Sequence, residues 1–128
     1  MNRSNSEIYA LIVCFVCVFA LVINFAEAVY AFVQINAPQV TMSKKDSEYR
    51  AIVTNDTYWR WITSAEKPAA RLPDAELTKQ RLAMRNDLVA AEAEEGKGKL
   101  LQALIYIFAL SGVLAFHWWY ARKVRNAA

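Results

Sequence analysis

The sequence is poor in the residues from which most enzyme sites are built. Its 128 residues include one histidine, two cysteines, three prolines and three glycines. A lone His117 cannot supply both axial ligands of a bis-histidine haem within one chain. The glycines, Gly96, Gly98 and Gly112, do not form a loop that could cradle a phosphate. We therefore expect no catalytic set, no cofactor and no metal ion, and a protein that is not an enzyme.

The two cysteines also exclude a disulfide-stapled outer domain. Cys14 and Cys17 have the C-x-x-C spacing of redox motifs, but they lie in an apolar run that lacks the strand and helix context in which this spacing matters. We interpret them as buried, inert thiols.

Charge is almost absent from two long apolar segments. Residues 8–23 are apolar without interruption, and the apolar character continues with polar interruptions to residue 35. Residues 100–120 carry no formal charge and would form a helix of roughly 31 Å, close to the ~30 Å hydrocarbon core of a bilayer. The pattern predicts an all-α integral membrane protein with two transmembrane helices in an antiparallel hairpin.

The expected organisation follows from these two segments. The first resembles a secretory signal, but its apolar character runs on past the small-residue pattern at residues 26–28, which indicates an uncleaved signal anchor. We predict a cytoplasmic tail at 1–7, a transmembrane helix at 8–36 that projects beyond the outer face, an extracytoplasmic loop at 37–98 with a helix near 74–95, a second transmembrane helix at 99–120, and a basic cytoplasmic tail at 121–128.

Aromatic and basic residues cluster at the C-terminal end, and the short N-terminal tail carries Arg3. Lysine and arginine are retained on the cytoplasmic side, while tryptophan and tyrosine favour the headgroup level. Both termini are therefore expected in the cytoplasm. The protein itself is expected in the inner membrane of a bacterium. The predicted membrane-interface anchors are Trp118, Trp119, Tyr120, Arg122, Lys123 and Arg125.

Small and polar residues recur on one face of the first apolar segment. In lipid, small residues let helix backbones approach closely, and polar side chains can hydrogen-bond across a helix pair. This face predicts a helix-packing or partner seam, and Gly112 is its expected counterpart in the second segment. The seam comprises Cys17, Ala20, Asn24, Glu27, Ala31 and Gln34. A water-filled pore lining and a solvated helix end are the alternatives.

Glu27 lies near one membrane boundary in this scheme. It is nineteen residues beyond Ile8, roughly 28 Å along a helix, and an antiparallel second helix would bring Lys99 and Gln102 to the same level. A carboxylate costs far less at the boundary than at the bilayer centre. Glu27 is expected to pair with Lys99, Gln102 or a donor from a partner.

The first helix should extend past the membrane, because Pro38 disfavours helix at residue 37 and nothing earlier breaks the pattern. Its projecting turns would expose apolar side chains, so we expect a protein cover over Val29, Tyr30, Phe32, Val33 and Ile35. The helix near 74–95 could supply it, since it has Leu77, Met84 and Leu88 on one face. This helix is expected to end at Gly96 and Gly98, or to run almost directly into the second span.

Residues 49–62 fit two structures. YRAIVT and TYWRWI alternate well enough for a small β-hairpin turning at Asn55-Asp56. An interfacial helix carrying Tyr58, Trp59 and Trp61 is the alternative, so the loop is expected to be mostly helical with a possible hairpin.

With no catalytic groups, the sequence favours a non-catalytic accessory or assembly subunit that packs into a larger membrane complex. The alternative is a homo-oligomeric channel or pore lined by Asn24, Glu27 and Gln34. The expected partners are membrane lipid and either other integral membrane subunits or copies of this chain, and no nucleic acid.

Overall fold

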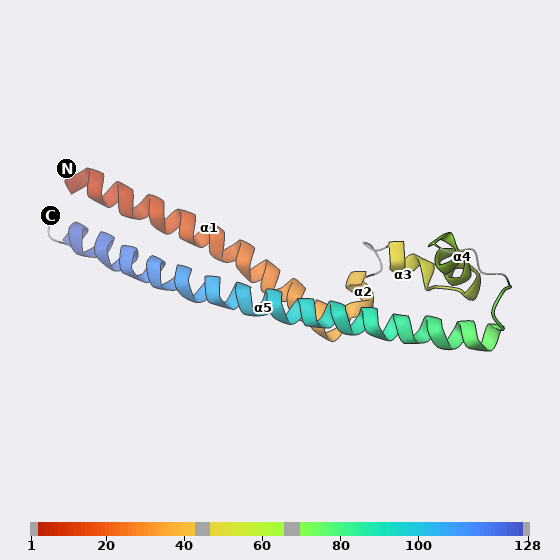
Figure 1. Ribbon diagram of the computed structural model, residues 1–128. Helices are drawn as coiled ribbons and strands as arrows, with labels where there is room; N and C mark the ends of the chain where they lie inside the picture. Colours follow the sequence, from red (N-terminus) through yellow and green to blue (C-terminus); the bar gives the residue numbers. More distant parts are fainter. Residues whose placement is uncertain (1–2, 43–46, 66–69, 127–128) are drawn as a thin grey trace. The chain divides into compact units, whose positions relative to one another are not determined.

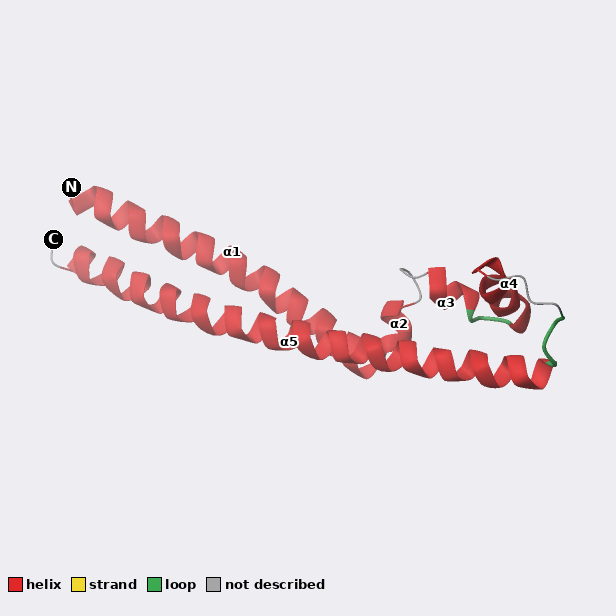
Figure 2. Ribbon diagram, in the orientation of Figure 1, coloured by secondary structure: helices red, strands yellow, loops and turns green. Residues whose placement is uncertain are grey.

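The computed structural model describes residues 3–42, 47–65 and 70–126, and 93% of these residues are helical. The expectations for residues 1–2, 43–46, 66–69 and 127–128 lie outside this part of the chain. Figures 1 and 2 show the helices. They are α1 (Arg3–Asn36), α2 (Pro38–Met42), α3 (Ser47–Ala51), α4 (Asn55–Ala65) and α5 (Asp74–Asn126).

The chain divides into two compact units. The first, which we call the apolar unit, combines Met1–Ala31 with Gly98–Ala128, and the second, the loop unit, is Phe32–Lys97. The long helices α1 and α5 both contain stretches that are long and apolar enough to cross a membrane. The two predicted apolar helices are therefore present, and residues 3–31 and 98–126 belong to the same unit.

Helix α1 ends where the sequence predicts. Its last residue is Asn36, one before the residue that Pro38 restricts. The Asn36 side-chain amide donates to the carbonyl of Phe32 at 2.8 Å, and the backbone amide of Ala37 donates to the carbonyl of Val33 at 2.7 Å. The second bond satisfies one of the last four carbonyls, which a helix end leaves without intrahelical partners.

Helix α5 does not end at Gly96 or Gly98, so that expectation is wrong. It runs for 53 residues from Asp74 to Asn126, and no glycine in the described residues has the positive φ of a helix-ending cap. Each glycine inside a helix costs only ~1 kcal/mol relative to alanine. The alanine, glutamate, lysine and leucine residues on both sides favour helix strongly enough to carry it through, which is the predicted alternative of a helix that continues into the second span.

The possible β-hairpin is not supported, and the described residues contain no strand. Residues 47–51 and 55–65 are helices instead, and a capping box explains the start of α4. The backbone amide of Thr57 donates to Thr54 Oγ1 and the backbone amide of Thr54 donates to Thr57 Oγ1, both at 3.1 Å. Two amides are thus satisfied reciprocally, and Asn55-Asp56 forms the first turn of a helix rather than a hairpin turn.

The loop unit has its own small core. Ile52, Tyr58 and the fully buried Leu77 form its centre, with Met84 and Leu88 packed against them. The expected apolar face of Leu77, Met84 and Leu88 is confirmed, and it packs against residues of α3 and α4.

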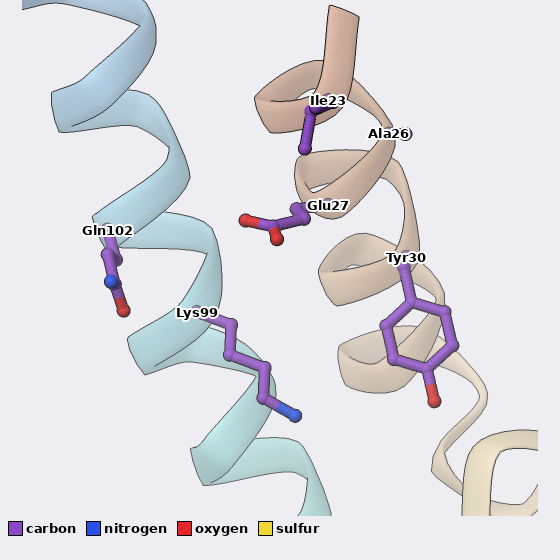
Figure 3. A pocket seen from close by; sticks show the side chains of 6 residues that line it. All are labelled: Ile23, Ala26, Glu27, Tyr30, Lys99 and Gln102. Carbon is purple, nitrogen blue, oxygen red and sulfur yellow. The ribbon is translucent and has the colours of Figure 1, made fainter. Parts of the chain in front are cut away.

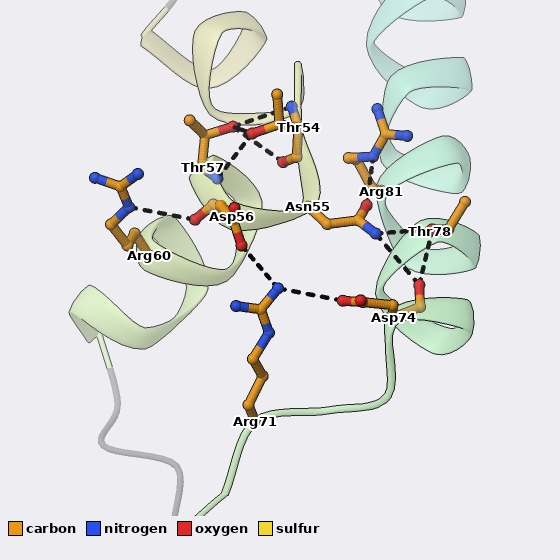
Figure 4. Close-up of polar contacts among 9 residues, drawn as sticks. All are labelled: Thr54, Asn55, Asp56, Thr57, Arg60, Arg71, Asp74, Thr78 and Arg81. Atoms are coloured by element: carbon orange, nitrogen blue, oxygen red, sulfur yellow. Dashed lines mark hydrogen bonds and ion pairs between the residues drawn. The ribbon is translucent and has the colours of Figure 1, made fainter.

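Polar contacts hold this cluster together (Figure 4). Arg81 donates to Asn55 Oδ1 at 3.0 Å, and Asn55 Nδ2 donates to Thr78 Oγ1 at 2.9 Å. Arg81 also donates to the carbonyls of Ile52 and Val53 at 3.1 Å each. One guanidinium thereby caps carbonyls at the end of α3 and fixes the first residue of α4.

A second guanidinium lies at the surface of the same cluster. Arg71 pairs with Asp56 at 2.7 Å and with Asp74 at 3.2 Å. Hydrogen bonds to Asp56 and then Asp74 raise the pKa of Arg71 above its ordinary value. The groups are exposed, so solvent screens these pairs and they contribute little to stability.

Candidate functional site

Part of the predicted seam on α1 is covered by the chain itself. Cys17 is buried, Ala31 has no exposed surface, and Ala20 and Asn24 are half-buried. The covered positions of the apolar unit also include Ala10 and Cys14, which continue the same spacing toward the N-terminus. Glu27 is the exception, because its side chain is exposed.

The last seam residue lies in the loop unit. Gln34 is 1% exposed, and its Oε1 has no hydrogen-bond partner among the described residues. A buried amide oxygen without a partner is uncommon in folded proteins. The structure therefore removes Gln34 from the surface that water or a partner chain could reach.

The covered face of α5 is not the one we expected. Gly112 is exposed, and a side chain added there would meet nothing within 4 Å. Gly112 therefore lies outside the face of α5 that this chain covers, and a seam for a partner at Gly112 stays a prediction. The residues that are buried or half-buried recur every three or four positions instead. In the part of α5 within the apolar unit they are Leu100, Ala103, Ile107, Leu110, Leu114, His117, Ala121 and Val124.

Residues from α1 and α5 approach each other at both ends of the apolar unit. Near the termini, the rings of Tyr9 and His117 have centroids 6.3 Å apart. His117 Nδ1 lies 3.0 Å from the carbonyl of Val113, to which it donates as the Nδ1–H tautomer. Toward the other end, Glu27 and Gln102 line a shared groove. Glu27, Lys99 and Gln102 thus lie near one another, while their common level in a membrane stays a prediction.

This groove is the most chemically distinctive part of the apolar unit. It has a volume of about 630 Å³, and Figure 3 shows the Glu27 carboxylate directed toward α5, with Lys99 and Gln102 on the facing helix. Its remaining lining residues are Ile23, Ala26 and Tyr30. A second groove of about 530 Å³ shares Ile23, Glu27 and Gln102 and continues along α5 past Tyr106 to Val113.

The polar groups around the groove are satisfied to different degrees. Asn24 Nδ2 donates to the carbonyl of Ala20 at 2.8 Å, and Gln102 Nε2 donates to Tyr106 Oη at 3.4 Å. Among the described residues, Glu27 makes no hydrogen bond or ion pair. The expected intramolecular pair with Lys99 or Gln102 is thus not formed, and the groove offers a charged acceptor beside apolar walls.

The predicted interface anchors lie at the terminal end of the apolar unit. Trp118, Trp119 and Tyr120 are exposed, and Lys123 Nζ lies 5.1 Å from the centroid of the Trp119 ring. Sequence reasoning missed Glu7, which lines a small cavity with Arg122 and Arg125. The sequence signal that could have identified Glu7 is that it is the one acidic residue in the two terminal tails, which otherwise carry basic residues.

The projecting turns of α1 have no cover of the kind we expected. Val29, Tyr30, Phe32 and Val33 are exposed, Phe32 by 59%, and only Ile35 is half-buried. Val29, Phe32 and Val33 are spaced i, i+3 and i+4 and so share one face of the helix, which we call the collar.

Residues of the kind that bind metal or carry out redox chemistry do not gather in the described part of the chain. It holds no cluster of three or more histidine, cysteine, aspartate or glutamate side chains suited to a metal ion. Cys14 and Cys17 are free thiols and both are buried, as the sequence predicted. They lie on the covered face of α1, where they act as small residues in helix packing.

Comparison with known proteins identifies no relative: no protein-family model, no curated protein and no solved structure matches this chain.

Proposed function

We propose that the apolar unit crosses a bilayer as an antiparallel helix pair, with both termini in the cytoplasm of a bacterial cell. The support is the exposure of large apolar side chains around both helices, including Phe15, Phe19 and Phe108, which water would disfavour and lipid would solvate. Trp118, Trp119 and the basic residues Arg122, Lys123 and Arg125 follow His117, at the end of the apolar unit where His117 meets Tyr9, as a cytoplasmic interface requires.

Within that membrane, the protein serves as a non-catalytic accessory or assembly subunit of a larger complex. The observation that carries this proposal is the collar. The side chains of Val29, Phe32 and Val33 are exposed, and in the proposed placement they lie beyond Glu27, outside the hydrocarbon layer. Apolar side chains in that position lose free energy in water and gain it by packing against another protein.

The size of this gain can be bounded. Complete burial of a large apolar side chain contributes ~1.5–3 kcal/mol, so Phe32, already 41% covered from its 59% exposure, would contribute ~1–2 kcal/mol. With Val29 and Val33 added, the collar supplies a few kcal/mol, and helix packing inside the bilayer supplies the rest.

Because part of the seam is buried within this chain, we assign the contact with a partner to a different surface. The sequence favoured the face of Ala20, Asn24, Glu27, Ala31 and Gln34 for a partner. Ala31 and Gln34 are buried within this chain, so the internal packing role suits them and the exposed collar is the better docking surface. The channel alternative is weakened for the same reason, because Gln34 is buried and the Asn24 amide bonds to its own helix.

A crosslinking and co-purification experiment tests this function. A photoreactive amino acid at position 32 should crosslink to another membrane protein, whereas the same group at Phe15, which is 73% exposed on the apolar segment, should crosslink chiefly to lipid. Phe32→Ser should release the chain from a stoichiometric complex after mild detergent extraction, and Phe15→Ala should not. Co-purification that Phe32→Ser leaves unchanged, or purification of the wild type as a lone monomer, contradicts the proposal.

A further inference from the structure

The groove beside Glu27 changes in chemistry along its length. Its mouth carries a carboxylate, an ammonium and an amide, from Glu27, Lys99 and Gln102. Its continuation shares Ile23, Glu27 and Gln102 with the mouth and is also lined by Asn24 and Tyr106. Only its far end, at Ala109, Leu110 and Val113, is entirely apolar. A polar mouth joined to an apolar tail matches the shape of one lipid better than that of a helix, which would present similar side chains throughout.

The length of the groove agrees with this reading. Eleven residues separate Gln102 from Val113, a rise of about 16 Å along α5. One leaflet occupies half of the ~30 Å hydrocarbon core, or about 15 Å. The groove therefore extends from the boundary level to the middle of a bilayer, whereas a transmembrane helix of a partner would need a contact surface through both leaflets.

We propose that this groove binds one phospholipid whose headgroup carries both a phosphate and a primary ammonium. The Glu27 carboxylate accepts hydrogen bonds from the ammonium, and Lys99 and Gln102 donate to phosphate oxygens. The Lys99 ammonium has three donors and the Gln102 amide two, so each can bind phosphate while keeping an existing contact. One acyl chain lies against Ile23, Leu110 and Val113. The inference rests on the proposed membrane placement, and it is independent of docking through the collar.

The Glu27 carboxylate determines which lipid headgroup the groove prefers. A primary ammonium donates charge-assisted hydrogen bonds to a carboxylate, which a quaternary ammonium cannot do and a glycerol headgroup can do only without charge. One such bond corresponds to about a tenfold difference in affinity. Binding should therefore rank phosphatidylethanolamine above phosphatidylcholine and phosphatidylglycerol.

Native mass spectrometry of the full-length protein in detergent tests the ranking. The three lipids, with identical acyl chains, are added in equal amounts. The wild type should retain phosphatidylethanolamine about tenfold over the other two. Glu27→Gln should abolish this preference, and Lys99→Gln should lower retention of all three lipids. Glu7→Gln, at the opposite end of the apolar unit, is the matched control and should change nothing.

Equal retention of the three lipids, or a preference that survives Glu27→Gln, overturns the lipid site. Stoichiometric crosslinking of a photoreactive group at position 26 to another polypeptide overturns it in favour of a partner helix. The membrane placement is tested separately by alkaline carbonate washing. A protein that stays in the membrane but does not discriminate refutes the lipid site alone, whereas one that is washed off refutes the placement as well.

Discussion

Arg81 joins the segment after α3 to the start of α4, and Arg81→Ala tests how much these contacts contribute to the stability of the loop unit. Its guanidinium donates three hydrogen bonds, to Asn55 Oδ1 and to the carbonyls of Ile52 and Val53. Hydrogen bonds of a charged group contribute ~1.5–3 kcal/mol each, but three bonds made by one partly buried side chain are not additive. We expect a total loss of ~2–4 kcal/mol in the local stability of α3 and α4.

Hydrogen exchange on the full-length protein in detergent micelles measures this loss. A change of ~2 kcal/mol accelerates exchange through local opening about 30-fold, so peptides spanning residues 52–62 should exchange at least that much faster. Peptides from residues 105–115 should be unaffected, because they belong to the apolar unit.

Two further variants make the result specific. Arg60→Ala removes an exposed arginine whose Nε donates only to the carbonyl of Asp56 in its own helix, at 3.4 Å, and should have little effect. Arg81→Lys keeps the charge but loses the planar fork, and should fall between the two alanine variants. If Arg81→Ala accelerates exchange no more than Arg60→Ala does, the hydrogen bonds of Arg81 do not stabilise the loop unit.

Other substitutions test the core, the cap and the two faces of the apolar unit. Leu77→Ala removes a fully buried side chain and should cost the loop unit ~2–5 kcal/mol, so unchanged exchange at residues 74–88 would argue against its core. Thr54→Ala removes the capping box and should cost ~1 kcal/mol, seen as faster exchange of the Thr57 amide; equal protection would argue against the cap. Ala31→Leu should destabilise the protein in micelles by ~1–3 kcal/mol through overpacking, whereas Gly112→Ala should stabilise it by ~0.5–1 kcal/mol; the reverse order would mean that the covered faces are misassigned.

The helices of the apolar unit could be predicted because their signals are local and long. An uninterrupted apolar run and a proline after Asn36 are sufficient to identify α1 and its end. The covered face of α5 could not be found in the same way, since apolar residues occupy every side of that segment. Small size pointed to Gly112, whereas the buried small residues of this face are Ala103 and Ala121, with the half-buried Ile107 and Leu114 between them. These positions are recognised by their three- and four-residue spacing.

The loop unit was harder to predict, because its structure depends on contacts between distant residues. Arg81 donates to carbonyls 28 and 29 residues away, and no local sequence pattern predicts such a contact. The choice between hairpin and helix at residues 49–62 could have been made from Thr54 and Thr57, whose spacing permits a reciprocal cap. The sequence predicted that Glu27 lies near Lys99 and Gln102, but not the groove that these residues line. The absence of the expected pair reflects side-chain geometry that spacing does not encode.

Accessibility labelling tests most directly the central claim, that the chain crosses the membrane twice with both ends on the cytoplasmic side. In a background where Cys14 and Cys17 are alanine, single cysteines replace Ser64 in the loop unit and Asn126 at the end of α5. A membrane-impermeant maleimide applied to intact cells should modify the cysteine at position 64, and the one at position 126 only after the membrane is opened. Modification of position 126 alone from outside would reverse the orientation, and equal modification of both would contradict a two-span protein.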